Sequence, residues 1–178
     1  MLYYIHGYQS SPDGNKGTLL KERLNVKAIK YRDCKPENLV ISDCLKRISN
    51  VIKNDENVVL IGSSLGGFLA ASTAIDRLNI KKIILLNPAI IPPSTNLDII
   101  QGMPMNILRD IVDRRLFEKK ISADITILRG TEDDMVPDEW VLEFAKAQEA
   151  TLIFYHDDHV FSKNLAKLPS IISEIVKK

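Results

Sequence analysis

A short segment rich in glycine and serine, Gly62-Ser63-Ser64-Leu65-Gly66, has the spacing of a nucleophile turn. It follows an apolar run and precedes an alanine-rich segment, which is the strand–turn–helix setting that such a turn requires. Glycine stands two residues before and two residues after Ser64, whereas Ser63 has Ile61 and Leu65 at those positions. Only glycine lets the backbone pass close to its neighbours at these points. We therefore predict Ser64 as a nucleophile for acyl transfer.

Acidic residues and a histidine follow Ser64 in the order that a serine hydrolase needs. Asp133 and Asp134 lie just after an apolar run, and either carboxylate has the chemistry to orient a histidine. His159 lies in the loop after the last apolar run, further along than His156, which we expect at the surface. The resulting Ser…Asp…His order is that of α/β-hydrolases. The four possible ligands His156, Asp157, Asp158 and His159 are consecutive rather than spaced on one helix face, so we expect no metal site.

The end of the first apolar run, Ile5-His6-Gly7-Tyr8, is a candidate for the second half of an oxyanion hole. A His-Gly pair at this point commonly begins the loop that supplies one backbone N–H donor. The two donors would be the N–H groups of Tyr8 and Leu65, and we expect His6 to shape the loop. Each such donor typically lowers the barrier by about 3 kcal/mol.

Six apolar runs alternate with helical patterns along the chain, which predicts a parallel sheet with helices on both faces. The expected strands are Leu2–Ile5, Val26–Ile29, Asn57–Ile61, Lys82–Leu86, Asp124–Leu128 and Thr151–Tyr155. The expected helices are Lys16–Leu24, Glu37–Lys53, Leu65–Leu78, Asn106–Phe117, Asp138–Ala147 and Ser162–Lys177. The fold class is therefore α/β, with about six mostly parallel strands in a single domain, residues 1–178. The candidate residues follow strands, where such sheets bind their ligands.

Residues 87–120 break this alternation, because several prolines precede the expected helix. The segment is either an ordinary crossover or a small cap over the site. A short cap favours an open site for small acyl groups. The tentative pocket residues are His6, Gly7, Phe68, Met103, Met105 and Phe161.

Composition narrows the class of partner. The 178 residues carry 24 basic and 23 acidic side chains, and a formal charge of +1 argues against a general nucleic-acid binder. No apolar run approaches the roughly 20 residues that cross a bilayer, and no signal peptide is visible, so we expect a cytoplasmic protein without a membrane partner. Cys34 and Cys44 fit no zinc pattern and are expected to be reduced thiols. The oligomeric state is not specified by these features.

With these residues in place, the chain resembles the α/β-hydrolase superfamily, and more narrowly the small YqiA-like esterases. The matching segments are Tyr4–Pro12 with Lys16, Gly62–Phe68, Asn87–Ala89 and Asp158–Phe161. The resemblance implies serine-dependent cleavage of short acyl esters or thioesters without a cofactor. It favours Asp133 as the acid, because Gly130, Asp133, Val136 and Pro137 fit the superfamily frame G-x-x-D-x-x-V-P.

Two features separate this chain from that pattern. Asp157 stands where glycine is usual before the Asp-His pair. The chain is also short, which implies a reduced α/β-hydrolase core without a large lid.

The expected function is a carboxylesterase acting on a small-molecule ester. The alternatives are an acyl-thioesterase with the same triad and a non-catalytic binding module that retains the pocket.

Overall fold

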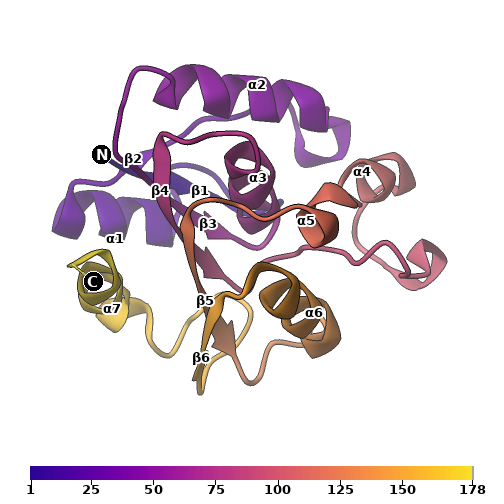
Figure 1. Cartoon of the computed structure of the whole chain (residues 1–178). Helices are drawn as coiled ribbons and strands as arrows, with labels where there is room; N and C mark the ends of the chain where they lie inside the picture. The colour runs from indigo at the N-terminus through magenta and orange to yellow at the C-terminus, as the bar shows by residue number, and fades with distance from the viewer. Residues whose placement is uncertain (178) are drawn as a thin grey trace.

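Six parallel strands form one sheet in the order β2-β1-β3-β4-β5-β6 (Figure 1). The computed structural model describes residues 1–177. The strands are β1 (Leu2–Ile5), β2 (Lys27–Ala28), β3 (Val58–Ser63), β4 (Ile80–Leu86), β5 (Asp124–Gly130) and β6 (Thr151–Tyr155). Each neighbouring pair is parallel. The sheet confirms the predicted α/β-hydrolase fold, with β3 and β4 at its centre.

The central strands are apolar on both faces because each face is covered by helices. In β3, Leu60 belongs to one buried cluster and Ile61 to the other. Neighbouring residues of a strand point to opposite faces, so a continuous apolar run needs two covers. The helices α1 (Asn15–Leu24) and α7 (Leu168–Lys177) pack together on one side. Figure 1 shows α2 (Ile41–Ile52), α3 (Leu65–Ala74) and α6 (Asp138–Gln148) on the other side.

Helix α3 follows the candidate nucleophile and lies deep in the protein. All ten of its residues, Leu65–Ala74, are buried, as expected for a helix that is apolar around its whole circumference. It ends before the predicted Leu78, whose side chain is 75% exposed. The position of α3 places its first turn directly at the carboxyl end of β3.

Three further predicted helices are shorter or broken. The predicted helix Asn106–Phe117 is divided into α4 (Met105–Asp110) and α5 (Arg115–Glu118), because the Asp113 carboxylate accepts the Arg115 N–H and begins a new turn. The prediction Glu37–Lys53 is divided into a 3₁₀ turn, Pro36–Asn38, and α2. The prediction Ser162–Lys177 becomes a loop, a 3₁₀ turn over Leu165–Lys167, and α7. Pro169 suits the first turn of α7 because it has no N–H to leave unpaired.

The segment 87–120 is fixed to the domain at both ends. At its start, the Ala89 N–H donates to the Ser64 carbonyl at 3.1 Å. At its end, the Gln148 side chain of α6 holds Leu116 O at 2.7 Å, Lys119 O at 2.9 Å and Ile121 N at 2.9 Å. Partly buried apolar side chains between these ends, such as Met103, pack on the main cluster. Whether the segment serves as a cap stays a prediction.

No helix within residues 1–177 combines the length and the apolar content that a membrane crossing requires.

Candidate active site

Ser64 occupies a left-handed backbone conformation between β3 and α3, with φ 53° and ψ −120°. A non-glycine residue rarely adopts such a conformation, and it persists only where the surroundings enforce it. Hydrogen bonds from the end of β4 supply that enforcement. The Ser64 N–H donates to Leu86 O at 3.0 Å, and the Ser64 carbonyl accepts from Ala89 N at 3.1 Å. The serine is therefore held at a sharp turn at the carboxyl edge of the sheet.

The glycines around Ser64 are needed because neighbouring backbone fills the space that side chains would occupy. A β-carbon on Gly62 would lie 2.4 Å from Gly66 O. A β-carbon on Gly66 would lie 2.1 Å from Ile5 O and 2.6 Å from His6 O. Side chains at these positions would collide with main-chain atoms. The structure thus gives a physical reason for the G-x-S-x-G spacing around Ser64.

His159 and Asp133 contact each other directly. His159 Nδ1 lies 3.0 Å from Asp133 Oδ2, and the Asp133 side chain is fully buried. Asp134, the alternative acid, is exposed. Because Nδ1 faces the carboxylate, Nε2 is the nitrogen left to exchange a proton with a hydroxyl. The geometry thus pairs His159 with Asp133 rather than with Asp134.

The Asp133 carboxylate is held ionised by its contacts. Burial acts to raise its pKa, but the hydrogen bond from His159 and the backbone N–H groups of Met135 and Val136 outweigh burial and lower the pKa. Those two N–H groups lie 2.8 and 3.1 Å from Asp133 Oδ1. An ionised acid at this position stabilises the imidazolium that forms when a histidine takes up a proton.

A buried arginine shares the acid with the histidine. Arg129 Nη1 lies 2.5 Å from Asp133 Oδ2, and its side chain is only 3% exposed. The same guanidinium donates to Val136 O and pairs with Asp138, each at 2.7 Å. Sequence reasoning assigned no role to Arg129, because the superfamily frame does not specify that position. Its fork of donors fixes the loop that carries Asp133.

Asn87 links the end of β5, which precedes the Asp133 loop, to the loop that carries His159. Its side-chain oxygen accepts from Gly130 N at 2.8 Å, and its side-chain nitrogen donates to Asp158 O and His159 O, both at 3.0 Å. Asn87 is fully buried, and its φ of 43° lies in the left-handed region that asparagine tolerates better than most residues. The sequence singled out Asn87 only as part of a matching segment. The visible signal was an asparagine before proline at the end of a strand.

The histidine loop is also fixed by Asp157, which is completely buried. Its carboxylate accepts from the backbone N–H groups of Asp158, Lys163 and Asn164 at 2.9 to 3.0 Å, and from the Asn164 side chain at 2.9 Å. This set of donors explains why an aspartate occupies a position where the resemblance led us to expect glycine. Asp157 O in turn accepts from Glu132 N at 2.9 Å, which joins the histidine loop to the acid loop.

Both predicted oxyanion donors adjoin Ser64. Leu65 is the first residue of α3, so its N–H has no acceptor within the helix. On the other side, a β-carbon on Gly7 would lie 3.4 Å from Ser64 Cβ and 4.0 Å from Ser64 Oγ. The loop that carries Tyr8 therefore passes directly beside the serine hydroxyl.

Ser64 and His159 do not bond to each other, but both are hydrogen-bonded to the short segment 86–89. Leu86 and Ala89 hold the backbone of Ser64, and Asn87 between them holds the His159 carbonyl. No Ser64–His159 hydrogen bond forms among the described residues. Catalytic hydrogen bonds of this kind are often long before substrate binds.

The tentative pocket residues do not form one group. Phe68 and Phe161 are buried in separate clusters, on opposite faces of the sheet. Met103 and Met105 are half-buried on the same cluster as Phe68. A pocket formed by these residues stays a prediction.

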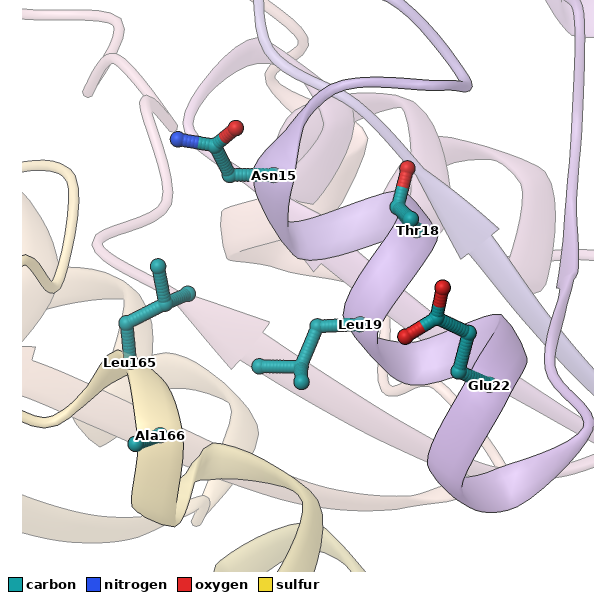
Figure 2. A pocket seen from close by; sticks show the side chains of 6 residues that line it. All are labelled: Asn15, Thr18, Leu19, Glu22, Leu165 and Ala166. Atoms are coloured by element: carbon teal, nitrogen blue, oxygen red, sulfur yellow. The ribbon is translucent and has the colours of Figure 1, made fainter.

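Two surface hollows lie away from the candidate triad. One, of about 370 Å³, lies between α1 and the segment 165–166. Figure 2 shows Leu19 pointing toward that segment. The other, of about 490 Å³, includes Asp124 and Thr151, at the amino ends of β5 and β6. Neither is lined by Ser64, Asp133 or His159. Within residues 1–177, no group of three or more His, Cys, Asp or Glu side chains is arranged to hold a metal ion.

Solved structures share this fold at low sequence identity. Alpha/beta hydrolase domain-containing protein 10 from mouse is similar with a TM-score of 0.81 and 18% identity, over 99% of this chain and 89% of that one. Est1E from Butyrivibrio proteoclasticus is similar with a TM-score of 0.78 and 20% identity, over 98% of this chain and 86% of that one. The esterase Pf2001 from Pyrococcus furiosus has a TM-score of 0.75 and 18% identity, over 99% and 81%.

A search of curated proteins finds no significant match. The family comparison also spans nearly the whole sequence. Residues 1–175 match the uncharacterised protein family UPF0227, and the chain therefore belongs to that family.

Proposed function

We propose that this protein is a serine hydrolase that cleaves small acyl esters through an acyl-enzyme on Ser64. The observation that carries the proposal is the strained turn at Ser64, whose backbone is held by Leu86 and Ala89, while Asn87 between them holds the His159 carbonyl. Strain of this kind clusters at functional sites. The contact between His159 and Asp133 supports their roles as the base and its orienting acid.

In the first step, Ser64 Oγ attacks the carbonyl carbon of the ester while His159 Nε2 takes the hydroxyl proton. The carbonyl oxygen becomes an oxyanion, which the N–H groups of Leu65 and Tyr8 stabilise. His159 then gives its proton to the departing alkoxide, and the acyl group remains on Ser64. Asp133 stabilises the imidazolium between these two transfers.

In the second step, water takes the place of the alcohol. His159 removes a proton from the water as its oxygen attacks the acyl carbon, and a second oxyanion forms in the same hole. Collapse of this intermediate releases the carboxylic acid and returns the proton to Ser64. The reaction consumes one water per ester and needs only the groups that this chain provides.

Two features support small esters as the first substrates to test. The segment 87–120 adds only the short helices α4 and α5 beside the sheet. Among the structurally similar proteins, Pf2001 and EaEST from Exiguobacterium antarcticum are named esterases, and one Est1E structure contains ferulic acid. We expect p-nitrophenyl esters of two to four acyl carbons to exceed long-chain esters in kcat/KM.

The decisive experiment combines covalent labelling with turnover. A fluorophosphonate should add once to the wild-type protein, as detected by intact mass, and Ser64→Ala should show no adduct. Turnover of p-nitrophenyl acetate should fall about 10⁴-fold or more in Ser64→Ala, as losses of triad members usually do. Ser63→Ala is the matched control, because it removes a hydroxyl from the adjacent buried residue.

Absence of an adduct on folded wild-type protein would contradict the proposal and favour a binding module. An adduct that persists in Ser64→Ala would assign the nucleophile to another residue. A parallel panel of acyl thioesters would distinguish a thioesterase from an esterase with the same triad.

A further inference from the structure

Two residues shortly after β2, Tyr31 and Arg32, contact the main chain of the loop that carries Tyr8. The Tyr31 hydroxyl lies 3.2 Å from His6 O and 3.3 Å from Gly7 O, and donates to these two carbonyls. Tyr31 is fully buried, so its hydroxyl has no competing contact with bulk water. Burial raises its pKa well above the usual range, so the hydroxyl keeps its proton and stays a donor.

Arg32 extends this contact along the same loop. Its Nη2 donates to Tyr8 O at 2.8 Å and to Ser10 O at 2.7 Å. Tyr31 and Arg32 together hold four carbonyls of the loop, those of residues 6, 7, 8 and 10. Their donors fix the orientation of the loop's peptide planes, since a charged or buried donor is costly to leave unpaired.

His6 is the second side chain that contacts the Gly7 carbonyl. His6 Nδ1 lies 2.9 Å from Gly7 O, and its ring stacks on Tyr31 with a centroid distance of 4.3 Å. A carbonyl can only accept, so Nδ1 must carry the proton. Burial lowers the pKa of His6 to about 4, which keeps the ring neutral near pH 7.

The orientation of the Gly7 carbonyl determines the direction of the Tyr8 N–H. The two groups belong to one peptide unit, and within residues 1–177 every peptide bond is trans. In a trans peptide, C=O and N–H point in opposite directions. Since the Gly7 carbonyl points to Tyr31 and His6, the Tyr8 N–H points away from them. Gly7 lies directly beside Ser64, so this peptide unit adjoins the serine hydroxyl.

We propose that Tyr31 and Arg32 are positioning residues of the oxyanion hole: by holding the loop carbonyls, they direct the Tyr8 N–H toward the substrate oxygen beside Ser64. This inference rests on the function proposed above and adds two residues that neither the nucleophile motif nor the Ser…Asp…His order contains. The two residues act through the backbone of Tyr8 and do not touch the substrate.

A residue with this role has a distinct kinetic signature. The oxyanion is fully developed only in the transition state, so a misdirected donor lowers kcat and leaves ground-state binding unchanged. Complete loss of one oxyanion donor typically lowers kcat about 10²- to 10³-fold. Loss of the group that orients it should have a smaller effect, of about 10-fold.

The test compares Tyr31→Phe and Arg32→Met with Tyr3→Phe. Each tyrosine variant removes one hydroxyl and keeps the ring. Tyr3 is the control because its hydroxyl donates to Asp55, in the loop that precedes β3, at the opposite end of the sheet from Ser64. For each variant we would measure kcat and KM with p-nitrophenyl acetate, and inhibition by a trifluoromethyl ketone, which forms an oxyanion-bearing adduct on a serine.

We expect Tyr31→Phe and Arg32→Met to lower kcat about 10-fold and to raise the inhibition constant of the ketone by a similar factor. KM should stay within about twofold of the wild-type value, and Tyr3→Phe should match wild type in all three constants. Concentrations are taken from fluorophosphonate titration, so that a fraction of misfolded protein does not lower kcat artificially.

The proposal is overturned if both variants keep wild-type kcat, or if KM rises while kcat and the ketone affinity are unchanged. Should Tyr31→Phe not fold, Arg32→Met decides the result. These outcomes presuppose an active wild type. A wild-type protein with neither turnover nor labelling would instead contradict the proposed function itself.

Discussion

The turn at Ser64 and the loops of Asp133 and His159 are held in place by different physical means. Main-chain hydrogen bonds and close backbone packing around Gly66 hold the Ser64 turn. Buried polar side chains, such as Asn87, hold the loops of the acid and the histidine. The first region depends on the packing and hydrogen bonds of the backbone, and the second depends on the charges and hydrogen bonds of side chains. The two regions should therefore fail under different perturbations.

Gly66→Ala should have the largest effect and should act on the serine side. The added methyl group would lie 2.1 Å from Ile5 O, which belongs to the backbone of β1 and cannot rotate away. We expect a loss of at least about 3 kcal/mol in the free energy of unfolding, at the upper end for overpacking. Fluorophosphonate labelling of Ser64 should be lost as well. Thermal denaturation and intact mass would measure the two effects.

Gly7→Ala is the matched control for this change. Its added methyl group would make only ordinary contacts, 3.4 Å from Ser63 O and from Ser64 Cβ. Its Tm should stay much closer to that of the wild type. Equal destabilisation by the two alanines would show that close packing is not what distinguishes the Ser64 turn.

As the pH is lowered, protonation of His6, in the loop that carries Tyr8, should destabilise the protein before protonation of Asp133 does. The pKa of His6 is about 4 in the folded protein, against about 6.5 when unfolded. Between these values the unfolded chain binds more protons, so stability falls as pH decreases from 6.5 to 4. The loss should reach at most about 3 kcal/mol. Urea denaturation at several pH values would show it, and His6→Gln should flatten the curve.

Asp133 provides the contrast within the same pH series. Its folded pKa is lowered, so its contribution to stability is complete above its ordinary value and is lost only at still lower pH. Asp133→Asn should therefore leave the slope between pH 6.5 and 4 unchanged. His156→Gln, at an exposed position, serves as the control for altering a histidine. A slope that persists in His6→Gln would contradict the assignment to His6.

Asn87→Asp tests whether side-chain hydrogen bonds hold the loop that carries His159. The aspartate keeps the shape and tolerates the left-handed backbone, but its second oxygen would face the carbonyls of Asp158 and His159 instead of donating to them. We expect kcat to fall about 10- to 100-fold as the histidine loop shifts, in line with small misplacements of catalytic groups. Steady-state kinetics would measure the fall.

Asn96→Asp is the control for this substitution. Asn96 is exposed, and it accepts the Asp98 N–H through an oxygen that aspartate retains. Unchanged kcat in Asn87→Asp would show that its donors do not position His159.

Lys163→Ala should have the smallest effect, although it removes an ion pair next to the histidine loop. Lys163 pairs with Glu132, and both side chains are more than 40% exposed. Exposed pairs of this kind contribute little, whereas the Lys163 backbone N–H keeps its bond to Asp157 in the variant. We expect Tm to be unchanged and kcat to stay within twofold. A large loss of activity would show that surface charges also hold the loop.

The contrast between local backbone packing and long-range side-chain contacts also explains which features the sequence could predict. The sharp turn at Ser64 was predictable because the need for glycine on either side is local and appears as a motif. The strands were predictable because burial on both faces requires continuous apolar runs, as in β3 and β4. A contact between His159 and an acid of the loop after β5 followed from the order of the loops once the fold was assumed, and the choice of Asp133 over Asp134 followed from the superfamily frame.

The positioning contacts were not predictable in this way. Asn87 meets His159 across 72 positions, and Tyr31 meets His6 across 25. Such partners depend on which loops the folded sheet brings together, and their residue types occur equally well at the surface. The break at Asp113 was missed because a single side-chain hydrogen bond outweighed a continuous helical pattern.

The two fixed ends of the segment 87–120 have a consequence for how proteins of this fold diversify. Ala89 anchors the segment to Ser64 at its start, and Gln148 anchors it to α6 at its end. An insertion between these anchors would lengthen the connection without moving the backbone of Ser64 or its link to the sheet. The segment is therefore a place where the chain can grow in gradual steps while the turn at Ser64 is inherited unchanged.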